Sequence, residues 1–190
     1  YLSMNLLHRM KNLAVVFVLL AVLGQTCGSG EIIRLIGSNL ALFGKASQSS
    51  TYYGASPQRA IDGNTEGTYG KGSCSCTRRQ TNPWWRVDLG KTYKIDTVTI
   101  TNRKDCCSGR LNGAEIHIGD TLVASGNANP RCAVIRSIGP RKSKTFKCNG
   151  MEGRYVNIVI PRKRRYQYLT LCEVEVTGTA SEETDEYACN

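Results

Sequence analysis

The sequence predicts an all-β domain, an antiparallel β-sandwich held together by disulfide bonds. Short runs of alternating apolar and polar residues recur between glycine-rich turns, and no long helical periodicity follows residue 30. Nine cysteines in 190 residues are typical of a secreted, oxidised protein rather than one kept in a reducing compartment. A chain of this length is large enough for one domain with its own core.

Four segments have the period of two that half-buried strands require. They are 95–101, 114–118, 155–160 and 169–176. In the first, Val98 and Ile100 would face the core, whereas Thr97 and Thr99 would face the other way. The two tryptophans of NPWWRVDLG (82–90) are expected to be the large anchors of that core.

The N-terminal segment has the order of a secretory signal: a basic stretch, an apolar run and then small residues. We therefore expect a signal peptide with upstream residues within 1–28 and a secreted, extracellular protein. A buried core helix is the alternative for the apolar run at 13–23, which is too short to cross a bilayer. The folded domain would occupy 31–178, and an acidic C-terminal tail would follow at 179–190.

The sequence offers little for an enzyme to use. Of its two histidines, His8 lies in the signal segment and His117 lies in a predicted strand without a nucleophile turn nearby. The closely spaced cysteines of CSC (74–76) and CC (106–107) lack the CxxC spacing of a zinc site. Recognition of a partner is the function class that remains.

The stretch NRKDCCSGR (102–110) carries most of the information about that partner. Adjacent Cα atoms are about 3.8 Å apart, whereas ordinary disulfides join Cα atoms roughly 4.4–6.8 Å apart. Cys106 and Cys107 therefore either find distant partners or close a ring with each other. Such a ring would be a polarizable platform for a sugar, with Arg103, Asp105 and Arg110 suited to its hydroxyls. The alternative gives these arginines to ordinary salt bridges.

Several blocks resemble, in order, those of the F-type lectins, the fucolectins of fish and related animals. The resemblance covers about 39–178 and includes GKASQSS, AIDGN, NPWWRVDLG, VTITNRKDCCSGR, GAEIHIG and LCEVEV. It implies a discoidin-like jelly roll, in agreement with the alternating segments. It also implies that Arg103, Asp105 and Arg110 bind L-fucose and that the sugar packs on a Cys106–Cys107 disulfide.

The resemblance further implies a Ca²⁺ ion near the binding loops, where hard oxygen ligands would suit it. The implied ligands are Asp62, the backbone of Arg59 and Asn64, Ser73, the backbone of Cys172, and Glu173. From its residues alone, AIDGN is more typical of a simple turn.

Two departures from the family pattern lie in the implied sugar site. Cys76 occupies the position of the family histidine, and Lys104 stands where glycine is usual. A thiol is a poor hydrogen-bond donor, so losing the imidazole would cost about 1–3 kcal/mol.

The family pattern also implies three disulfides, namely Cys74–Cys172, Cys106–Cys107 and Cys132–Cys148. Cys76 and Cys189 are then left to pair with each other or between chains, and a homo-oligomer stays open.

We therefore predict a secreted, calcium-binding lectin that recognises fucosylated glycans on cell or microbial surfaces in innate immunity. The alternative is a lectin scaffold that lost fucose binding through Cys76. It would bind anionic glycans or acidic membrane surfaces through the basic run PRKRRY (161–166), which otherwise is a solvated loop. A purely structural module is the third possibility, and nucleic acid is not an expected partner.

Overall fold

A computed structural model describes residues 38–161 and 166–181. The predicted signal peptide, Cys189, the basic residues 162–165 and the tail from 182 lie outside the described residues. None of the helices in the described part is long and apolar enough to span a membrane.

The described residues form eight strands and five short 3₁₀ helices. The strands are β1 (Lys45–Gln48), β2 (Ser75–Cys76), β3 (Trp84–Thr101), β4 (Ala114–Gly119), β5 (Arg131–Ile135), β6 (Ser143–Val159), β7 (Thr170–Leu171) and β8 (Glu173–Ala180). The 3₁₀ helices are η2 (Leu40–Phe43), η3 (Pro57–Ala60), η4 (Tyr69–Lys71), η5 (Ser108–Leu111) and η6 (Val123–Gly126). The prediction of an all-β fold is confirmed.

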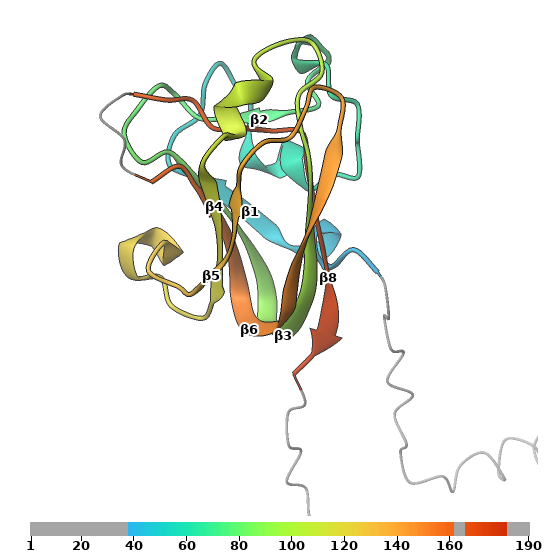
Figure 1. Cartoon of the computed structure of the whole chain (residues 1–190), viewed down its shortest axis with the longest axis vertical. Coiled ribbons are helices and arrows are strands. Elements are labelled where there is room, and N and C mark those ends of the chain that lie inside the picture. Colours follow the sequence, from blue (N-terminus) through green and yellow to red (C-terminus); the bar gives the residue numbers. More distant parts are fainter. Residues whose placement is uncertain (1–37, 162–165, 182–190) are drawn as a thin grey trace, which may run out of the picture. The chain divides into compact units, whose positions relative to one another are not determined.

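The two longest strands, β3 and β6, build both layers of the sandwich. They pair along their whole length, with register shifts between Asp88 and Tyr93 and between Ile95 and Thr97, where both strands curl (Figure 1). β1 pairs with the first half of β3, and β4 pairs with the second half of β6 and carries β5 at its outer edge. β8 pairs with the second half of β3. Each long strand thus contributes one half to each layer.

The core lies between these layers and follows the predicted alternation. Val98 and Ile100 are fully buried, whereas Thr97 and Thr99 are half-buried on the outer face. Trp85 is also fully buried, and its indole Nε1 donates to the Pro57 carbonyl at 2.9 Å. The expectation of two tryptophan anchors is wrong for one of them, because the neighbouring side chain in a strand points outward and Trp84 is only half-buried.

The predicted strand at 169–176 is in fact two strands that meet at a bend. β7 pairs with β2 in a separate two-stranded sheet, and β8 joins the main sheet beside β3. The chain bends at Cys172, which is disulfide-bonded to Cys74. This bend explains why the buried positions change from Leu169 and Leu171 to Val174 and Val176.

All three implied disulfides are present, at Cys74–Cys172, Cys106–Cys107 and Cys132–Cys148. Two of them tie together segments far apart in the sequence, and the third joins neighbours. The β2–β7 sheet and the loop that follows β3 meet at one end of the sandwich, where η5 also lies (Figure 1). The candidate binding residues are carried by these segments.

Candidate functional site

The loop after β3 is fixed by the side chain of Asn102, which is 2 % exposed. Its amide Nδ2 donates to the carbonyls of Ser108 at 3.0 Å and Ile138 at 2.7 Å, and its Oδ1 accepts from the Arg103 backbone N–H at 2.8 Å. A buried amide with all these partners is costly to displace, so it holds the loop in one conformation. Sequence reasoning missed this role, although Asn102 opens the motif.

Cys106 and Cys107 are bonded to each other, which settles the choice between distant partners and a ring. Their Cα atoms are 3.7 Å apart, and Cys107 has a left-handed backbone with a φ of 62°. Both residues are exposed. The disulfide therefore presents a small, flat, polarizable surface to solvent at the tip of the loop.

Arg103 lies beside this disulfide in a rigid arrangement with Asp105. Its Nε and Nη2 donate to the two carboxylate oxygens at 2.6 and 2.8 Å, and its guanidinium lies 4.4 Å from the centre of the Tyr69 ring. The hydrogen bonds from Arg103 lower the pKa of Asp105 to about 2. The carboxylate is therefore ionised at neutral pH, and the pair presents a fixed donor next to a fixed acceptor.

Arg110, in η5, closes the NRKDCCSGR stretch and contacts residues of β7 and of the segment just before it. Its Nη1 donates to Thr170 Oγ1 at 3.2 Å, and its guanidinium lies 4.5 Å from the centre of the Tyr168 ring. A guanidinium has five N–H donors, so this single bond leaves others for a ligand. Arg103 and Arg110 are thus each supported by a tyrosine face.

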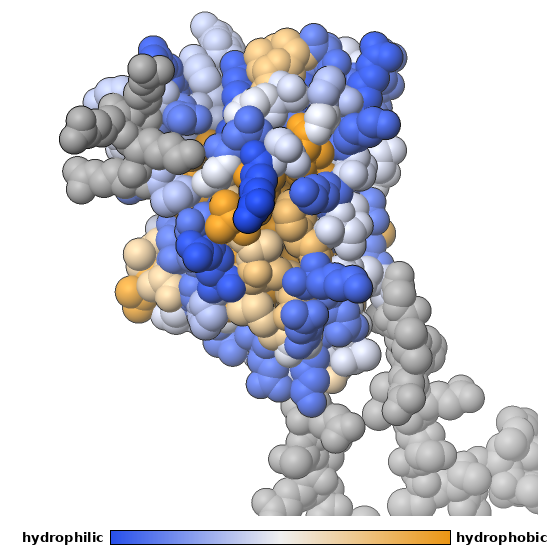
Figure 2. Space-filling view, viewed as in Figure 1, coloured by the Kyte–Doolittle hydropathy of each residue, from blue (hydrophilic) through white to orange (hydrophobic). Residues whose placement is uncertain are grey.

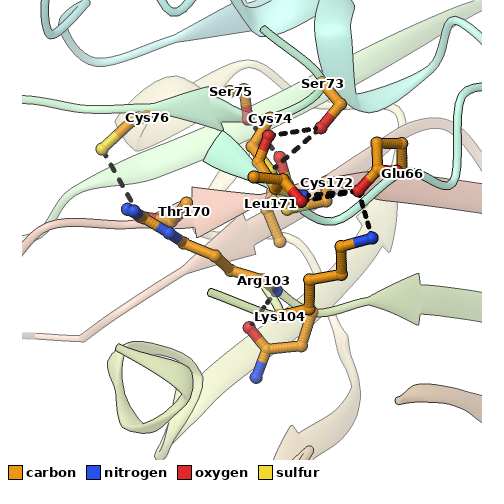
Figure 3. The surroundings of a disulfide bond; sticks show 12 residues. Glu66, Ser73, Cys74, Ser75, Cys76, Arg103, Lys104, Thr170, Leu171 and Cys172 are labelled. Carbon is orange, nitrogen blue, oxygen red and sulfur yellow. Dashed lines mark hydrogen bonds and ion pairs between the residues drawn. A yellow bond between two sulfur atoms is a disulfide. The ribbon is translucent and has the colours of Figure 1, made fainter. Parts of the chain in front are cut away.

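Cys76 lies in β2 within this group of residues. Its side chain is buried, its Sγ donates to the Thr77 carbonyl at 3.3 Å, and it is 3.4 Å from Thr170 Oγ1. Figure 3 shows Cys76 beside the guanidinium of Arg103, whose pKa is raised chiefly by Asp105 and also by Cys76. Among the described cysteines, Cys76 is the one outside a disulfide.

The structure therefore gathers all the residues singled out for sugar binding. Thr170 joins the two halves of the group because it contacts both Arg110 and Cys76. Thr170, Tyr69 and Tyr168 were not predicted, since their part depends on contacts between segments far apart in the sequence. The one hint in the sequence is the tyrosine-rich stretch YQYLT (166–170).

A second cluster forms where the AIDGN loop meets the start of β8. Glu173 is 1 % exposed, and its Oε1 accepts from the Gly63 backbone N–H at 3.2 Å. Its Oε2 is buried without a hydrogen-bond partner in the described structure. The pKa of Glu173 is raised to about 7, chiefly by burial and in smaller part by the nearby charge of Asp62, while the hydrogen bond from Gly63 opposes the rise. A buried carboxylate with a free oxygen beside a second carboxylate would be stabilised by a cation.

The other implied calcium ligands lie on the segments next to this pair in the chain or bonded to it. Ser73 is buried and donates to the Thr68 carbonyl at 3.1 Å, and Cys172 is fixed by the disulfide to Cys74. Arg59 lies in the last turn of η3, just before the loop, and Asn64 donates its backbone N–H to Asp62 Oδ1 at 2.9 Å. No group of three or more histidine, cysteine or acidic side chains gathers within 38–161 and 166–181. Any cation here would use two carboxylates completed by carbonyl and hydroxyl oxygens, a donor set that fits Ca²⁺.

Lys104 joins the loop that follows β3 to the segment at Glu66 and Gly67. Its ammonium forms an ion pair with Glu66, and its backbone N–H donates to the Gly67 carbonyl at 2.9 Å. The pKa of Glu66 is lowered to about 2, chiefly by its hydrogen bond with Lys104. The lysine at this position therefore attaches the loop with the vicinal disulfide to the segment that precedes η4.

Known proteins resemble this chain in sequence and in fold. The protein family described as "NedA-like, galactose-binding domain" matches residues 59–158. Fucolectin-1 of Anguilla japonica is 44 % identical over 177 residues, which cover 90 % of this chain and 97 % of the relative.

Two solved structures are also similar. A fucolectin from striped bass (Morone saxatilis) serum is 53 % identical with a TM-score of 0.74, covering 77 % of this chain and 49 % of the other. This chain thus spans about half the length of the bass protein. The lectin domain of lectinolysin in complex with Lewis B antigen is 32 % identical with a TM-score of 0.66, covering 77 % of this chain and all of that domain. The chain belongs to the F-type lectin (fucolectin) family.

Proposed function

We propose that the protein is a secreted lectin that binds L-fucose at the ends of glycans. The observation that carries this proposal is the exposed Cys106–Cys107 disulfide placed between Arg103 and Arg110. Family membership makes the chain a binding protein rather than an enzyme. The lectinolysin domain, which was solved with a fucosylated antigen, supports the same ligand class.

The proposed contacts with the sugar are of two kinds, polar and apolar. Guanidinium N–H groups of Arg103 and Arg110 would donate to sugar hydroxyl oxygens, and the Asp105 carboxylate would accept from a hydroxyl. The apolar face and the methyl group of fucose would pack on the disulfide by dispersion. Because Arg103 is already paired with Asp105 and stacked on Tyr69, little side-chain entropy is lost on binding.

Weak intrinsic affinity is expected, because Cys76 replaces the imidazole that the family uses. Losing one hydrogen bond in a buried site costs about 1–3 kcal/mol. This is a large share of the total binding free energy of a ligand with a Kd of 1 mM, which is about 4 kcal/mol. Presentation of several sites against a surface dense in fucose would offset the loss. The serum origin of the bass relative and the three disulfides support an extracellular role, which we propose to be innate recognition of microbial or cell-surface glycans.

The mutation Arg110→Ala should reduce L-fucose affinity at least tenfold, since it removes charge-assisted donors worth about 1.5–3 kcal/mol. Titration of the protein with L-fucose, followed by NMR or calorimetry, measures the effect. Arg131→Ala is the matched control, because Arg131 lies in β5 and is half-exposed beside Glu115. Equal affinity in both variants, or saturation by D-glucose as readily as by L-fucose, would contradict the proposal.

We also propose that Ca²⁺ binds at Asp62 and Glu173, with Ser73 and the backbones of Arg59, Asn64 and Cys172 nearby. The ion would supply positive charge that stabilises two close carboxylates, one of them buried. These residues hold the AIDGN loop against β8, so the ion would stabilise the fold next to the sugar site rather than contact the sugar.

Removing calcium with a chelator should therefore lower the melting temperature. Saturation at a hundredfold excess over Kd contributes about 2.7 kcal/mol, or about 5–10 °C for a domain of this size. Glu173→Gln should abolish the response to calcium, whereas Glu152→Gln, at an exposed position of β6, should retain it. Identical melting curves in calcium and chelator would overturn this part of the proposal. A protein that calcium stabilises but that does not bind fucose would favour a scaffold whose ligand has changed.

A further inference from the structure

We propose that a pocket beside the fucose site binds an anionic substituent, a sulfate or a carboxylate, on the sugar that neighbours the fucose. This inference rests on the proposed function and deepens it by naming the class of glycan. The pocket has a volume of about 530 Å³, which is in the range of small-ligand sites. It is lined by Thr51, Tyr52, Tyr53, Gly54, Arg78 and Arg79.

The pocket is connected to the sugar site by direct contacts. The Tyr52 backbone N–H donates to the Cys76 carbonyl at 2.9 Å, and Arg78 follows Cys76 by two residues. The rings of Tyr52 and Tyr168 have centroids 5.4 Å apart, and Tyr168 is the ring beneath Arg110. One aromatic contact therefore separates the pocket from the residue proposed to hold fucose, so a disaccharide could reach both.

The charge of the pocket is uncompensated. Arg78 and Arg79 are exposed, and neither forms an ion pair with a carboxylate in the part of the chain that the structure describes. Their Nε atoms donate to the carbonyls of Thr51 at 3.2 Å and Tyr166 at 3.4 Å. These bonds anchor both side chains near the pocket but do not neutralise them. Two positioned guanidinium groups with free N–H donors favour an anionic ligand that accepts hydrogen bonds, such as sulfate or carboxylate.

Tyr53 gives the pocket an aromatic wall. Its side chain is 87 % exposed, and its ring packs edge-on against Tyr52 with centroids 4.5 Å apart. Its φ of 41° lies in the left-handed region, which is uncommon for a bulky residue and recurs at ligand-binding loops. An exposed ring held in this way offers an apolar surface for the face of a sugar. Arg78 and Arg79 would then bind the anionic substituent of this sugar.

Elsewhere in the described part of the chain, exposed apolar side chains do not specify a ligand. In the face shown in Figure 2, hydrophobic side chains are visible at the loop of η6, where Leu122 and Val123 are 50 % and 65 % exposed, but nothing in the structure indicates what would cover them. The tyrosine and arginine pocket differs because its chemistry specifies the ligand.

The test compares three ligands on the full secreted chain: a neutral fucosylated trisaccharide, the same compound with a sulfate on the sugar next to fucose, and the same compound with sialic acid there. At least one anionic form should bind about fivefold more tightly than the neutral form at low salt, and the advantage should shrink as salt rises. The double variant R78Q/R79Q should lose this advantage and keep its affinity for the neutral compound. The control K91Q/K94Q removes the same charge from exposed positions of β3 and should keep the advantage.

The outcomes separate this inference from the proposed function. Equal affinity for neutral and anionic compounds, with fucose binding intact, would overturn the pocket and leave the fucose site standing. Loss of the advantage in both double variants would also overturn it, because the effect would then come from net charge. If no compound binds, both proposals fail. If only anionic compounds bind, through Arg78 and Arg79, the pocket stands and the fucose contacts alone are insufficient.

Discussion

Replacing Cys76 with histidine is expected to raise the affinity for L-fucose about five- to a hundred-fold. The thiol is a weak donor that already bonds to the Thr77 carbonyl, so it contributes little to a sugar hydroxyl. An imidazole at the same position is longer than the thiol that it replaces and could donate one good hydrogen bond to a sugar hydroxyl. Such a bond in a desolvated site is worth about 1–3 kcal/mol, which gives the expected range.

The backbone at this position should accept the larger residue. The Cys76 N–H donates to the Ala55 carbonyl at 3.2 Å, its carbonyl accepts from Tyr52, and β2 pairs with β7. These bonds fix where the side chain emerges, between Arg103 and Thr170 (Figure 3). Imidazole is larger than a thiol, so a modest loss of stability is expected as well.

Calorimetric titration of Cys76→His and of Cys76→Ser at pH 7.5 would measure the effect. The serine variant keeps the size of cysteine and replaces the thiol with a stronger donor, so its affinity should rise less than that of the histidine variant. A histidine variant that folds normally and binds fucose no more tightly than the parent would show that Cys76 does not limit affinity.

The fold could be predicted from the sequence because its signals are local. Alternation at Val98 and Ile100 reports one exposed and one buried face of a strand, and the structure confirms it. Trp84 and the break at Cys172 were not predicted correctly. Both depend on which other segment packs against or pairs with that part of the chain, and periodicity does not specify this.

The candidate site was predictable where chemistry is concentrated in one stretch. Arg103, Asp105, the two cysteines and Arg110 lie within 102–110, so their proximity follows from the chain itself. Thr170, Tyr168 and Tyr69 were missed because they come from elsewhere in the sequence. Their roles depend on tertiary contacts that no local pattern encodes, such as the bond from Arg110 to Thr170.

Removing the Cys74–Cys172 disulfide with C74S/C172S is expected to lower the free energy of unfolding by about 4–5 kcal/mol. The bond closes a loop of 98 residues, and the entropy lost by the unfolded chain on cross-linking grows with loop length. Both cysteines are fully buried, so the replacement also leaves two hydroxyls in an apolar setting.

The position of this disulfide makes the functional effect as large as the structural one. Cys74 immediately precedes β2, which carries Cys76, and Cys172 separates Thr170 from Glu173. One covalent bond thus positions residues of the proposed sugar site and of the proposed calcium cluster. Without it, β2 and β7 are held by a two-residue pairing and a few hydrogen bonds, such as the one from Ser75 Oγ to the Leu171 carbonyl at 3.2 Å. We therefore expect weaker fucose binding and a smaller response to calcium in the same variant.

Urea unfolding and fucose titration of C74S/C172S test this expectation, with C132S/C148S as the matched control. The control pair spans 16 residues and joins β5 to β6, so its removal should cost about 3 kcal/mol and leave fucose affinity unchanged. Equal losses of affinity in the two variants would point to general destabilisation. A loss of fucose affinity in C74S/C172S alone, measured in urea-free buffer where both variants are folded, would establish that this disulfide positions the residues of the two sites.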